Sequence, residues 1–230
     1  MKAIILAAGK ATRLLPLTKN MPQCMLKLGQ KTILEIQVQN IKKAGIKDIV
    51  LVTGYLSAKL ENFCKKLGVS TLFNPFYEVS GMALSLWIAK EELKTDCIVL
   101  YSDVLFDSKI ITGLLEQKGD ICLAIKKNGL REEAEKVIEI NGIIKNMSKT
   151  QFDEANGEFI GIAKFFGKGI EKLLNELRNV AKINLNTSFI ELLDNLIKKD
   201  EIVMSYDIQN SQFIDVDFPK DLEKAEQLFN

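Results

Sequence analysis

The chain has 230 residues, 47% of them hydrophobic and 27% charged, with a formal net charge of +1. This length predicts one domain, 1–230, and the near-neutral charge argues against a nucleic-acid partner or attraction to a membrane. The absence of histidine excludes Ser-His and Cys-His nucleophilic catalysis and His-ligated metal sites, which leaves carboxylate-bound magnesium and positively charged side chains.

The chain opens with an uninterrupted apolar segment, Lys2–Ala8, which predicts a strand buried on both faces of a parallel sheet. A loop of small residues follows and leads to Arg13. Free N–H groups in such a loop hold phosphate oxygens, and a guanidinium adds forked, charged donors. Gly9 alone would indicate a tight turn, and the loop is neither a Walker A motif nor a dinucleotide fingerprint. The whole string predicts a phosphate-rich ligand.

Strands and helices alternate over the first half of the chain. The pattern predicts helices over 33–44, 56–67, 82–93 and 110–117, and strands over 49–52, 69–73, 97–101 and 121–125. Repeated β-α-β units with apolar strands predict an α/β fold with a doubly wound, mostly parallel (mixed) sheet. Ligands of such folds bind at the edge where the strands end, and the loops leaving that edge are 8–20, 53–56, 74–81 and 102–107.

The second half of the chain follows a different pattern. It predicts a hairpin around Asn141-Gly142, then strands over 158–165, 202–206 and 213–216, and helices over 169–180, 187–199 and 219–229. The polarity of 141–157 suits a surface flap. No apolar run reaches transmembrane length and no secretory signal is recognisable, so four widely spaced cysteines indicate reduced thiols in a cytoplasmic protein.

Acidic residues follow two of the predicted strands. Asp103 comes just after the strand 97–101, where it faces the ligand edge of the sheet. Asp215 and Asp217 share one face of their segment because strand side chains alternate. Asp107 is the better candidate for a helix cap, and Asp221 suits the first turn of the last helix.

The string Leu6–Arg13, Leu17-Thr18 and Pro22 resembles the signature of nucleotidyltransferases that join a nucleoside triphosphate to a phosphorylated small molecule. That family pattern is roughly L-A-A-G-x-G-x-R, then L-T, then P-K. The resemblance implies a Rossmann-like fold, with nucleotide binding by 1–127 and acceptor binding and closure by 128–230. It also implies catalytic roles for Arg13, Asp103 and Asp217, with Mg²⁺ held by the two Asp residues and Asp215 in support.

Two residues depart from that pattern. Ala11 replaces the second Gly, a mild change if residue 11 has a negative φ. Gln23 replaces a Lys that lies on the reacting phosphates in the family, and a neutral amide does not neutralise charge. Either Lys10, Lys19, Lys27 or Lys164 substitutes for it, or activity is weak, or the acceptor is unusual.

The compact length and the strings 74–80 and 84–87 look most like the small cytidylyltransferases of choline phosphate and phosphonates. A pair of Asn residues is common in that subgroup where Gly81-Met82 stands here. The resemblance implies nucleotide contacts by Leu6, Ala7, Ala8, Gly9, Lys10, Ala11, Thr12, Gln23, Ser80, Gly81 and Ser85. On the acceptor side we expect Glu158, Lys164 and Tyr77, although Glu158 and Lys164 equally suit a solvated edge strand.

We therefore expect a Mg²⁺-dependent cytidylyltransferase that joins CTP to a phosphorylated acceptor and releases pyrophosphate. Phosphocholine, aminoethylphosphonate and an amino-acid-amide phosphate such as phosphoglutamine fit as acceptors. An ionised phosphate is itself a nucleophile, so the reaction needs no general base. The alternatives are a sugar-1-phosphate uridylyl- or thymidylyltransferase, and a non-catalytic nucleotide-binding regulatory protein, which Gln23 keeps open. The sequence leaves open whether the protein is a monomer or a homodimer.

Overall fold

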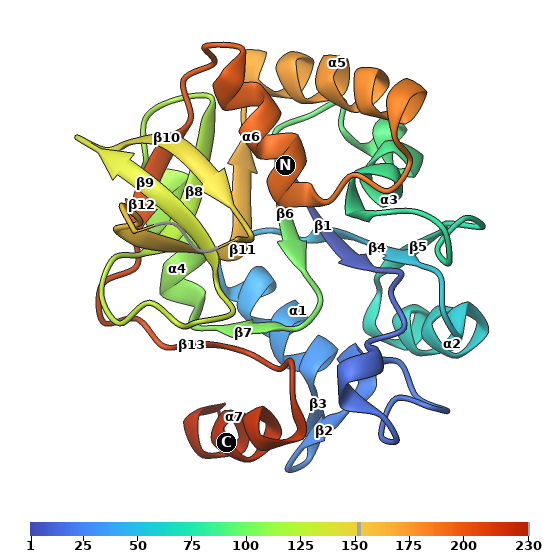
Figure 1. Cartoon of the computed structure of the whole chain (residues 1–230). Helices are drawn as coiled ribbons and strands as arrows, with labels where there is room; N and C mark the ends of the chain where they lie inside the picture. Colours follow the sequence, from blue (N-terminus) through green and yellow to red (C-terminus); the bar gives the residue numbers. More distant parts are fainter. Residues whose placement is uncertain (151–152, 230) are drawn as a thin grey trace.

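In the computed structural model, which describes residues 1–150 and 153–229, strands from both halves of the chain share one sheet (Figure 1). Its nine strands lie in the order β5-β4-β1-β6-β11-β8-β12-β10-β9. Their bounds are β1 Lys2–Ala7, β4 Asp48–Thr53, β5 Ser70–Phe73, β6 Cys97–Tyr101, β8 Ile121–Lys126, β9 Glu135–Ile140, β10 Ile143–Ser148, β11 Gly157–Phe165 and β12 Met204–Asp207. Two small ladders join β2 (Lys27–Leu28) to β3 (Lys31–Thr32) and β7 (Val104–Phe106) to β13 (Phe213–Asp215).

The sheet is parallel on one side and mixed on the other. β1 pairs in parallel with β4 and β6, and β4 pairs in parallel with β5. β11 then runs antiparallel between β6 and β8, and β9 and β10 form an antiparallel hairpin. The predicted α/β fold with a mixed sheet is therefore confirmed.

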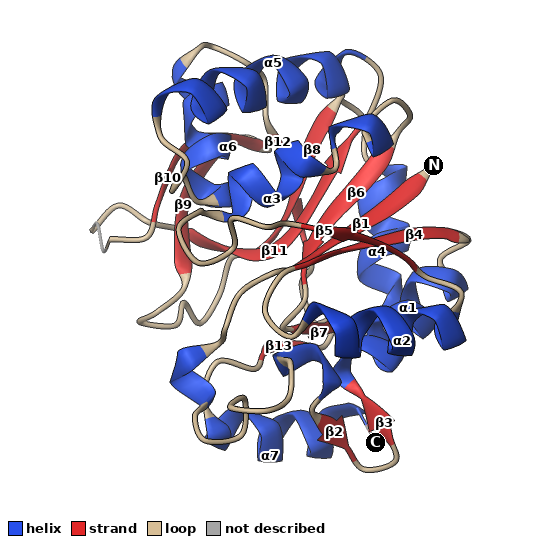
Figure 2. Cartoon of the chain, turned by 90° about the vertical axis from the view of Figure 1, so that its right-hand side faces the viewer, coloured by secondary structure: helices blue, strands red, loops and turns tan. Residues whose placement is uncertain are grey.

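Helices cover both faces of this sheet. Figure 2 shows α3, α5 and α6 on one face and α1, α2 and α4 on the other, with α7 below beside β2 and β3. The helices are α1 Ile33–Lys43, α2 Ser57–Leu67, α3 Met82–Ile88, α4 Ser108–Glu116, α5 Lys168–Ile183, α6 Phe189–Lys198 and α7 Pro219–Phe229, with 3₁₀ turns η1 Thr12–Leu14, η2 Gln23–Met25 and η3 Lys90–Glu92. Each of α1 and α6 begins with a capping box, Thr32 with Glu35 and Ser188 with Glu191, which satisfies two amide groups that the helix leaves free.

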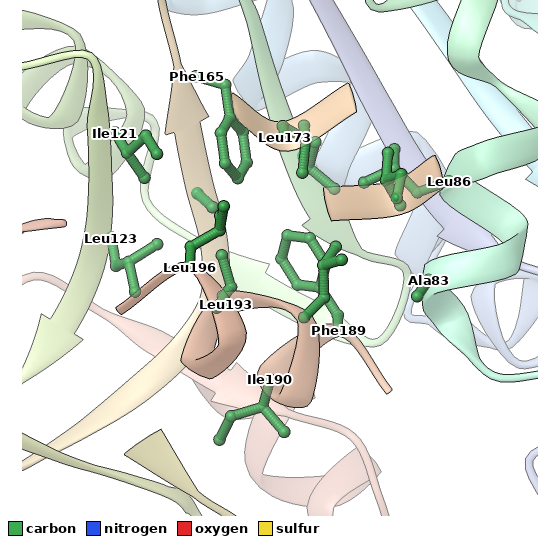
Figure 3. Packing of buried hydrophobic residues seen from close by; sticks show 14 of the residues in the cluster. Ala83, Leu86, Ile121, Leu123, Phe165, Leu173, Phe189, Ile190, Leu193 and Leu196 are labelled. Atoms are coloured by element: carbon green, nitrogen blue, oxygen red, sulfur yellow. The ribbon is translucent and has the colours of Figure 1, made fainter. Parts of the chain in front are cut away.

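The hydrophobic core has one layer on each side of the sheet. Under α3, α5 and α6, the Phe189 ring lies edge-on to Tyr101, with 5.9 Å between the ring centroids. The centroids of Phe189 and Phe165 are 6.4 Å apart, and both rings are labelled in Figure 3. The opposite layer packs α1, α2 and α4 against the same strands. A smaller cluster under α7 includes Leu14 and Val216, so it ties the first loop of the chain to its last strand.

Several boundaries differ from those predicted. The helix expected over 82–93 ends at Ile88 and continues as the 3₁₀ turn η3. The helix expected from residue 110 starts at Ser108, because the Asp107 side chain accepts from the Lys109 N–H at 3.0 Å and caps it. β2, β3 and β7 are only two or three residues long, too short to show an alternating pattern.

Within the region expected to be a flap, 141–157, residues 143–148 form β10. Asn141 and Gly142 both have positive φ and form the tight turn between β9 and β10, as predicted. Residue 157 already belongs to β11, and residues 151–152 of that region lie outside the described residues. All four cysteines are free and buried, and no helix in the described ranges is long and apolar enough to cross a bilayer.

Candidate active site

The first loop leaves the carboxyl end of β1 and folds back on itself. Its turn is closed by the Leu14 N–H and the Thr18 hydroxyl, which both donate to the Ala11 carbonyl, at 3.1 and 2.9 Å. Ala11 has φ 48°, in the left-handed region. Ala11 in place of the family's second glycine is therefore not a mild change, because a residue other than glycine in this conformation costs about 1–2 kcal/mol.

This loop forms one wall of a cavity that we call the loop cavity. Its other walls come from 77–85, from the end of β6 and from Asp217. Most of the residues predicted from the sequence lie along it, namely Leu6, Ala7, Ala8, Gly9, Ala11, Arg13, Gln23, Tyr77, Ser80, Gly81, Ser85, Asp103 and Asp217. Lys10 and Thr12 do not line it, and the Lys10 ammonium pairs instead with Glu78 at 2.7 Å.

The wall of the loop cavity at 80–85 is held by a buried amide. The Asn74 side-chain amide donates to Ser80 Oγ and Ser85 Oγ at 3.1 and 3.0 Å, and its carbonyl oxygen accepts from the Phe76 N–H. The start of α3 is also tied to the segment before α6, because Gly81 and Ala83 donate to the carbonyls of Leu185 and Thr187. A Cβ at residue 81 would meet the Thr187 carbonyl oxygen at 2.1 Å, so only glycine fits there.

Three carboxylates from distant parts of the sequence converge between β7 and β13. The Val216 N–H donates to the Asp103 carbonyl at 3.0 Å, and β13 pairs with β7 so that Asp215 stands opposite Val104. Burial, reinforced by the charges of Asp215 and Asp217, raises the pKa of Asp103 to about 7. Burial likewise raises the pKa of Asp215 to about 6, although Arg131 opposes the shift.

The donor set of this cluster fits a divalent cation. Oδ1 of Asp103 and Oδ1 of Asp215 are buried without a hydrogen-bond partner, an arrangement that costs free energy unless a cation or water fills it. Asp217 receives the Arg13 guanidinium at 2.6 Å. No group of three or more ligating side chains is preformed in the described ranges, but Mg²⁺ needs only one or two carboxylates when phosphates and water complete its shell.

A second cavity adjoins the first and shares Leu6, Arg13, Met82, Asp103 and Asp217 with it. We call it the carboxylate cavity, because Glu133, Glu135 and Asp215 also line it. Tyr101 donates its hydroxyl to Glu135 at 2.8 Å, and the Lys149 ammonium lies 3.7 Å from the same carboxylate. Burial raises the pKa of Glu135 to about 7, against the opposing effects of Lys149 and Tyr101.

The sequence prediction did not include Glu133, Glu135, Tyr101 or Lys149. Glu135 begins β9, and Lys149 directly follows β10, the second strand of the predicted Asn-Gly hairpin. The Asn141-Gly142 turn predicts the hairpin that carries Glu135 and Lys149. Its position against β11 and β12 depends on strand pairing across the whole second half, which no local pattern encodes.

Two residues expected on the acceptor side line neither cavity. Glu158 is fully buried and accepts from Arg131, and the Lys164 ammonium donates to the Gln117 carbonyl. Both lie on one face of β11, as their parity predicts, but opposite Lys126 and Cys122 of β8, which are separated by about 13 Å of strand. Lys164 thus stands at the end of β11 that pairs with the start of β6, and neither residue lines the loop cavity or the carboxylate cavity.

Gln23 binds the segment that directly follows β13. Its side-chain amide donates to the Val216 carbonyl at 2.5 Å. Lys19, Lys27 and Lys164 line neither cavity, so Arg13 and Lys149 are the cations among the described residues that do. Lys149 lines the carboxylate cavity alone, so Arg13 is the cation that shares the loop cavity with Gln23 among the described residues.

Comparison with known sequences agrees with this geometry. The model of a family described as nucleotidyl transferase matches residues 2–133. The chain is 30% identical to the CTP:phosphoglutamine cytidylyltransferase of Campylobacter jejuni, over 97% of this chain and 98% of that protein. It is 27% identical to the choline-phosphate cytidylyltransferase of Streptococcus pneumoniae, over 99% and 98% of the two chains.

Solved structures share the fold. A CTP:phosphocholine cytidylyltransferase from Streptococcus pneumoniae superposes with a TM-score of 0.82, at 23% identity and over 100% of this chain and 99% of the other. An inositol-1-phosphate CTP transferase from T. maritima gives 0.85 at 22% identity, over 99% and 94%. With a matching family model over more than half of its length, the chain belongs to the nucleotidyl transferase family.

Proposed function

We propose that this protein is a Mg²⁺-dependent cytidylyltransferase that joins CTP to a small phosphorylated acceptor and releases pyrophosphate. The observation that carries the proposal is the pair of adjoining cavities with Arg13, Asp103 and Asp217 on their shared wall. The choice of CTP rests on the two relatives aligned over nearly their whole length, which are both cytidylyltransferases by name.

In this proposal the loop cavity holds CTP. The backbone of 7–11 and the Arg13 guanidinium face the triphosphate, and Ser80 and Ser85, oriented by Asn74, border the base or ribose. The acceptor occupies the carboxylate cavity, where Lys149 meets its phosphate. Its phosphate attacks the α-phosphorus in line, and pyrophosphate leaves. A phosphate dianion needs no general base, so catalysis rests on orientation and charge neutralisation.

Asp103 and Asp217 would hold the cation, with Asp215 beside them. Bound Mg²⁺ neutralises charge on the phosphate oxygens during transfer. Arg13 acts on both sides of the reaction because it lines both cavities and contacts Asp217.

We also propose that the acceptor carries a cationic or N–H-donating group beside its phosphate. Glu135 is a buried carboxylate within reach of Lys149, so one small molecule with a phosphate and an amino or amide group can engage both. Glucose 1-phosphate offers hydroxyl groups in place of such a group. A cytoplasmic location fits four free, buried thiols, and the oligomeric state stays between monomer and homodimer.

The test is pyrophosphate release with Mg²⁺, using CTP, UTP, ATP, GTP and dTTP in turn. Each is paired with phosphocholine, aminoethylphosphonate, phosphoglutamine, inositol 1-phosphate and glucose 1-phosphate. We expect release with CTP and an acceptor that carries a cationic or N–H-donating group. Release only with UTP or dTTP and glucose 1-phosphate contradicts the proposal, and CTP binding without any turnover favours a regulatory protein in which Gln23 has abolished catalysis.

A further inference from the structure

Arg131, on the segment between β8 and β9, joins carboxylates from two different strands. Its Nε donates to Glu158 Oε1 at 3.2 Å, and its backbone N–H donates to Glu158 Oε2 at 3.1 Å. Its Nη2 donates to Asp215 Oδ2 at 2.5 Å, and the guanidinium carbon lies 5.2 Å from the centre of the Phe213 ring. The guanidinium is therefore hydrogen-bonded to β11 on one side and to β13 on the other.

Glu158 serves this guanidinium and not a ligand. Its side chain is fully buried and lines neither the loop cavity nor the carboxylate cavity. A buried carboxylate needs a charged, hydrogen-bonded partner, and Arg131 supplies three donor contacts to it. The pair fixes where the guanidinium nitrogen Nη2 points.

The Nη2 atom of Arg131 fixes one carboxylate oxygen of Asp215, Oδ2. With Oδ2 bound by Arg131, rotation of this carboxylate is restricted. Oδ1 is buried and unpartnered, on a side chain that lines the carboxylate cavity with Asp103 and Asp217. Asp103 Oδ1 is unpartnered in the same way. The side chains that carry these two acceptors without donors both line the carboxylate cavity.

We propose that Arg131, anchored on Glu158, is a positioning residue that turns Oδ1 of Asp215 toward a divalent cation, so that Asp215 is a cation ligand and not only a neighbour of one. The inference rests on the cation site of the proposed function. Ligating carboxylates are commonly held by hydrogen-bond partners of this kind, and losing one weakens metal binding about 10–100-fold. The opposing effect is that removing Arg131 also removes a positive charge that repels the cation. The inference requires orientation to outweigh that repulsion.

The experiment measures Mn²⁺ binding to the full-length protein in the presence of CTP by titration with electron paramagnetic resonance. We expect Arg131→Met to raise the Mn²⁺ dissociation constant about 10–100-fold. Arg131→Lys should give a Mn²⁺ dissociation constant between those of Arg131→Met and the parent protein, because lysine keeps the positive charge but loses the forked N–H donors of the guanidinium. The matched control is Lys127→Met, which breaks an ion pair to the buried Glu139 near the same segment without contacting Asp215, and we expect unchanged binding.

A further variant guards against misfolding of Arg131→Met, in which the buried carboxylate of Glu158 loses its partner. Arg131→Met combined with Glu158→Leu removes both partners of the buried pair and should show the same loss of Mn²⁺ binding. Adding Asp215→Asn to Arg131→Met should weaken binding little further, since both changes remove one interaction.

Unchanged or tighter Mn²⁺ binding in the folded Arg131 variants would overturn the inference, as would fully additive losses with Asp215→Asn. A parent protein that binds CTP but no Mn²⁺ would instead overturn the cation site of the proposed function. The two failures are therefore distinguishable.

Discussion

The two cavities that meet at Arg13 are built in different ways. The loop cavity is walled mainly by backbone and small side chains from 6–24 and 77–85, and Arg13 is its cation among the described residues. The carboxylate cavity is walled by charged side chains on or next to β9, β10 and β13, namely Glu133, Glu135, Lys149 and Asp215, and Lys149 pairs with Glu135. A backbone wall suits a ligand of fixed shape, whereas a wall of charged side chains discriminates by the ligand's charge pattern. We therefore expect acceptor choice to depend on few side chains.

Removing Arg13 should give the largest effect, because this residue belongs to both cavities. Arg13→Ala deletes a charged donor beside the reacting phosphates, so we expect kcat/KM to fall about 10²–10³-fold. Steady-state kinetics of pyrophosphate release measures this. The matched control is Arg178→Ala, which removes an exposed guanidinium from α5 and should leave the kinetics unchanged. Near-normal turnover of Arg13→Ala would remove Arg13 from the mechanism.

Neutralising Glu135 should affect one cavity alone. Glu135→Gln keeps the shape but removes a charge-assisted hydrogen bond worth about 1.5–3 kcal/mol. We expect the KM for an amino-bearing acceptor to rise about 10–100-fold and the KM for CTP to stay constant. Glu154→Gln, an exposed change on the loop between β10 and β11, is the control. Equal changes in both KM values would mean that the cavities are not separate.

The same residue predicts a pH dependence. Because the pKa of Glu135 is raised to about 7, the carboxyl is largely protonated below that pH and ionised above it. The KM for an amino-bearing acceptor should therefore decrease as the pH rises through about 7. The acceptor phosphate titrates in a similar range, so the informative quantity is the difference between the parent and Glu135→Gln. Identical profiles for the two proteins would contradict the assignment.

A side chain at residue 81 should perturb the loop cavity through its backbone wall. Gly81→Ala forces a Cβ against the Thr187 carbonyl, and overpacking of this kind costs about 1–3 kcal/mol. Each kcal/mol lowers the melting temperature of a chain this long by about 2–4 °C. Gly9→Ala is the control for calorimetry, because a Cβ there meets nothing within 4 Å. Equal melting temperatures for Gly81→Ala and Gly9→Ala would show that the 185–187 segment moves to accommodate the Cβ without loss of stability.

Restoring a lysine at residue 23 should give the smallest effect. Gln23→Lys keeps a donor near the Val216 carbonyl and adds a positive charge to the loop cavity. A partly exposed charge pair contributes about 0.2–1 kcal/mol, so we expect turnover to rise by no more than about fivefold. Single-turnover measurements at saturating CTP test this. A large loss of turnover would mean that the amide contact itself is required.

Local patterns predicted much of the loop cavity and little of the carboxylate cavity. The strand β1, the small-residue loop and Arg13 lie within one short stretch of sequence, and Asp103 follows a buried strand directly. Glu135, Lys149 and Arg131 reach the site only because β11 runs antiparallel between β6 and β8 and pairs also with β9. Parity predicted the face of β11 that carries Glu158 and Lys164, but only that pairing shows which end of the strand meets the ligand edge.

The hydrogen bond from Val216 to Asp103 has a consequence for the order of assembly. β13 belongs to the last part of the chain, yet it pairs with β7 and brings Asp215 and Asp217 to a carboxylate more than a hundred positions earlier. Contacts of such sequence separation form late, since a long loop must close first. A chain still emerging from the ribosome would thus carry an unfinished carboxylate cluster until β13 is released and pairs with β7.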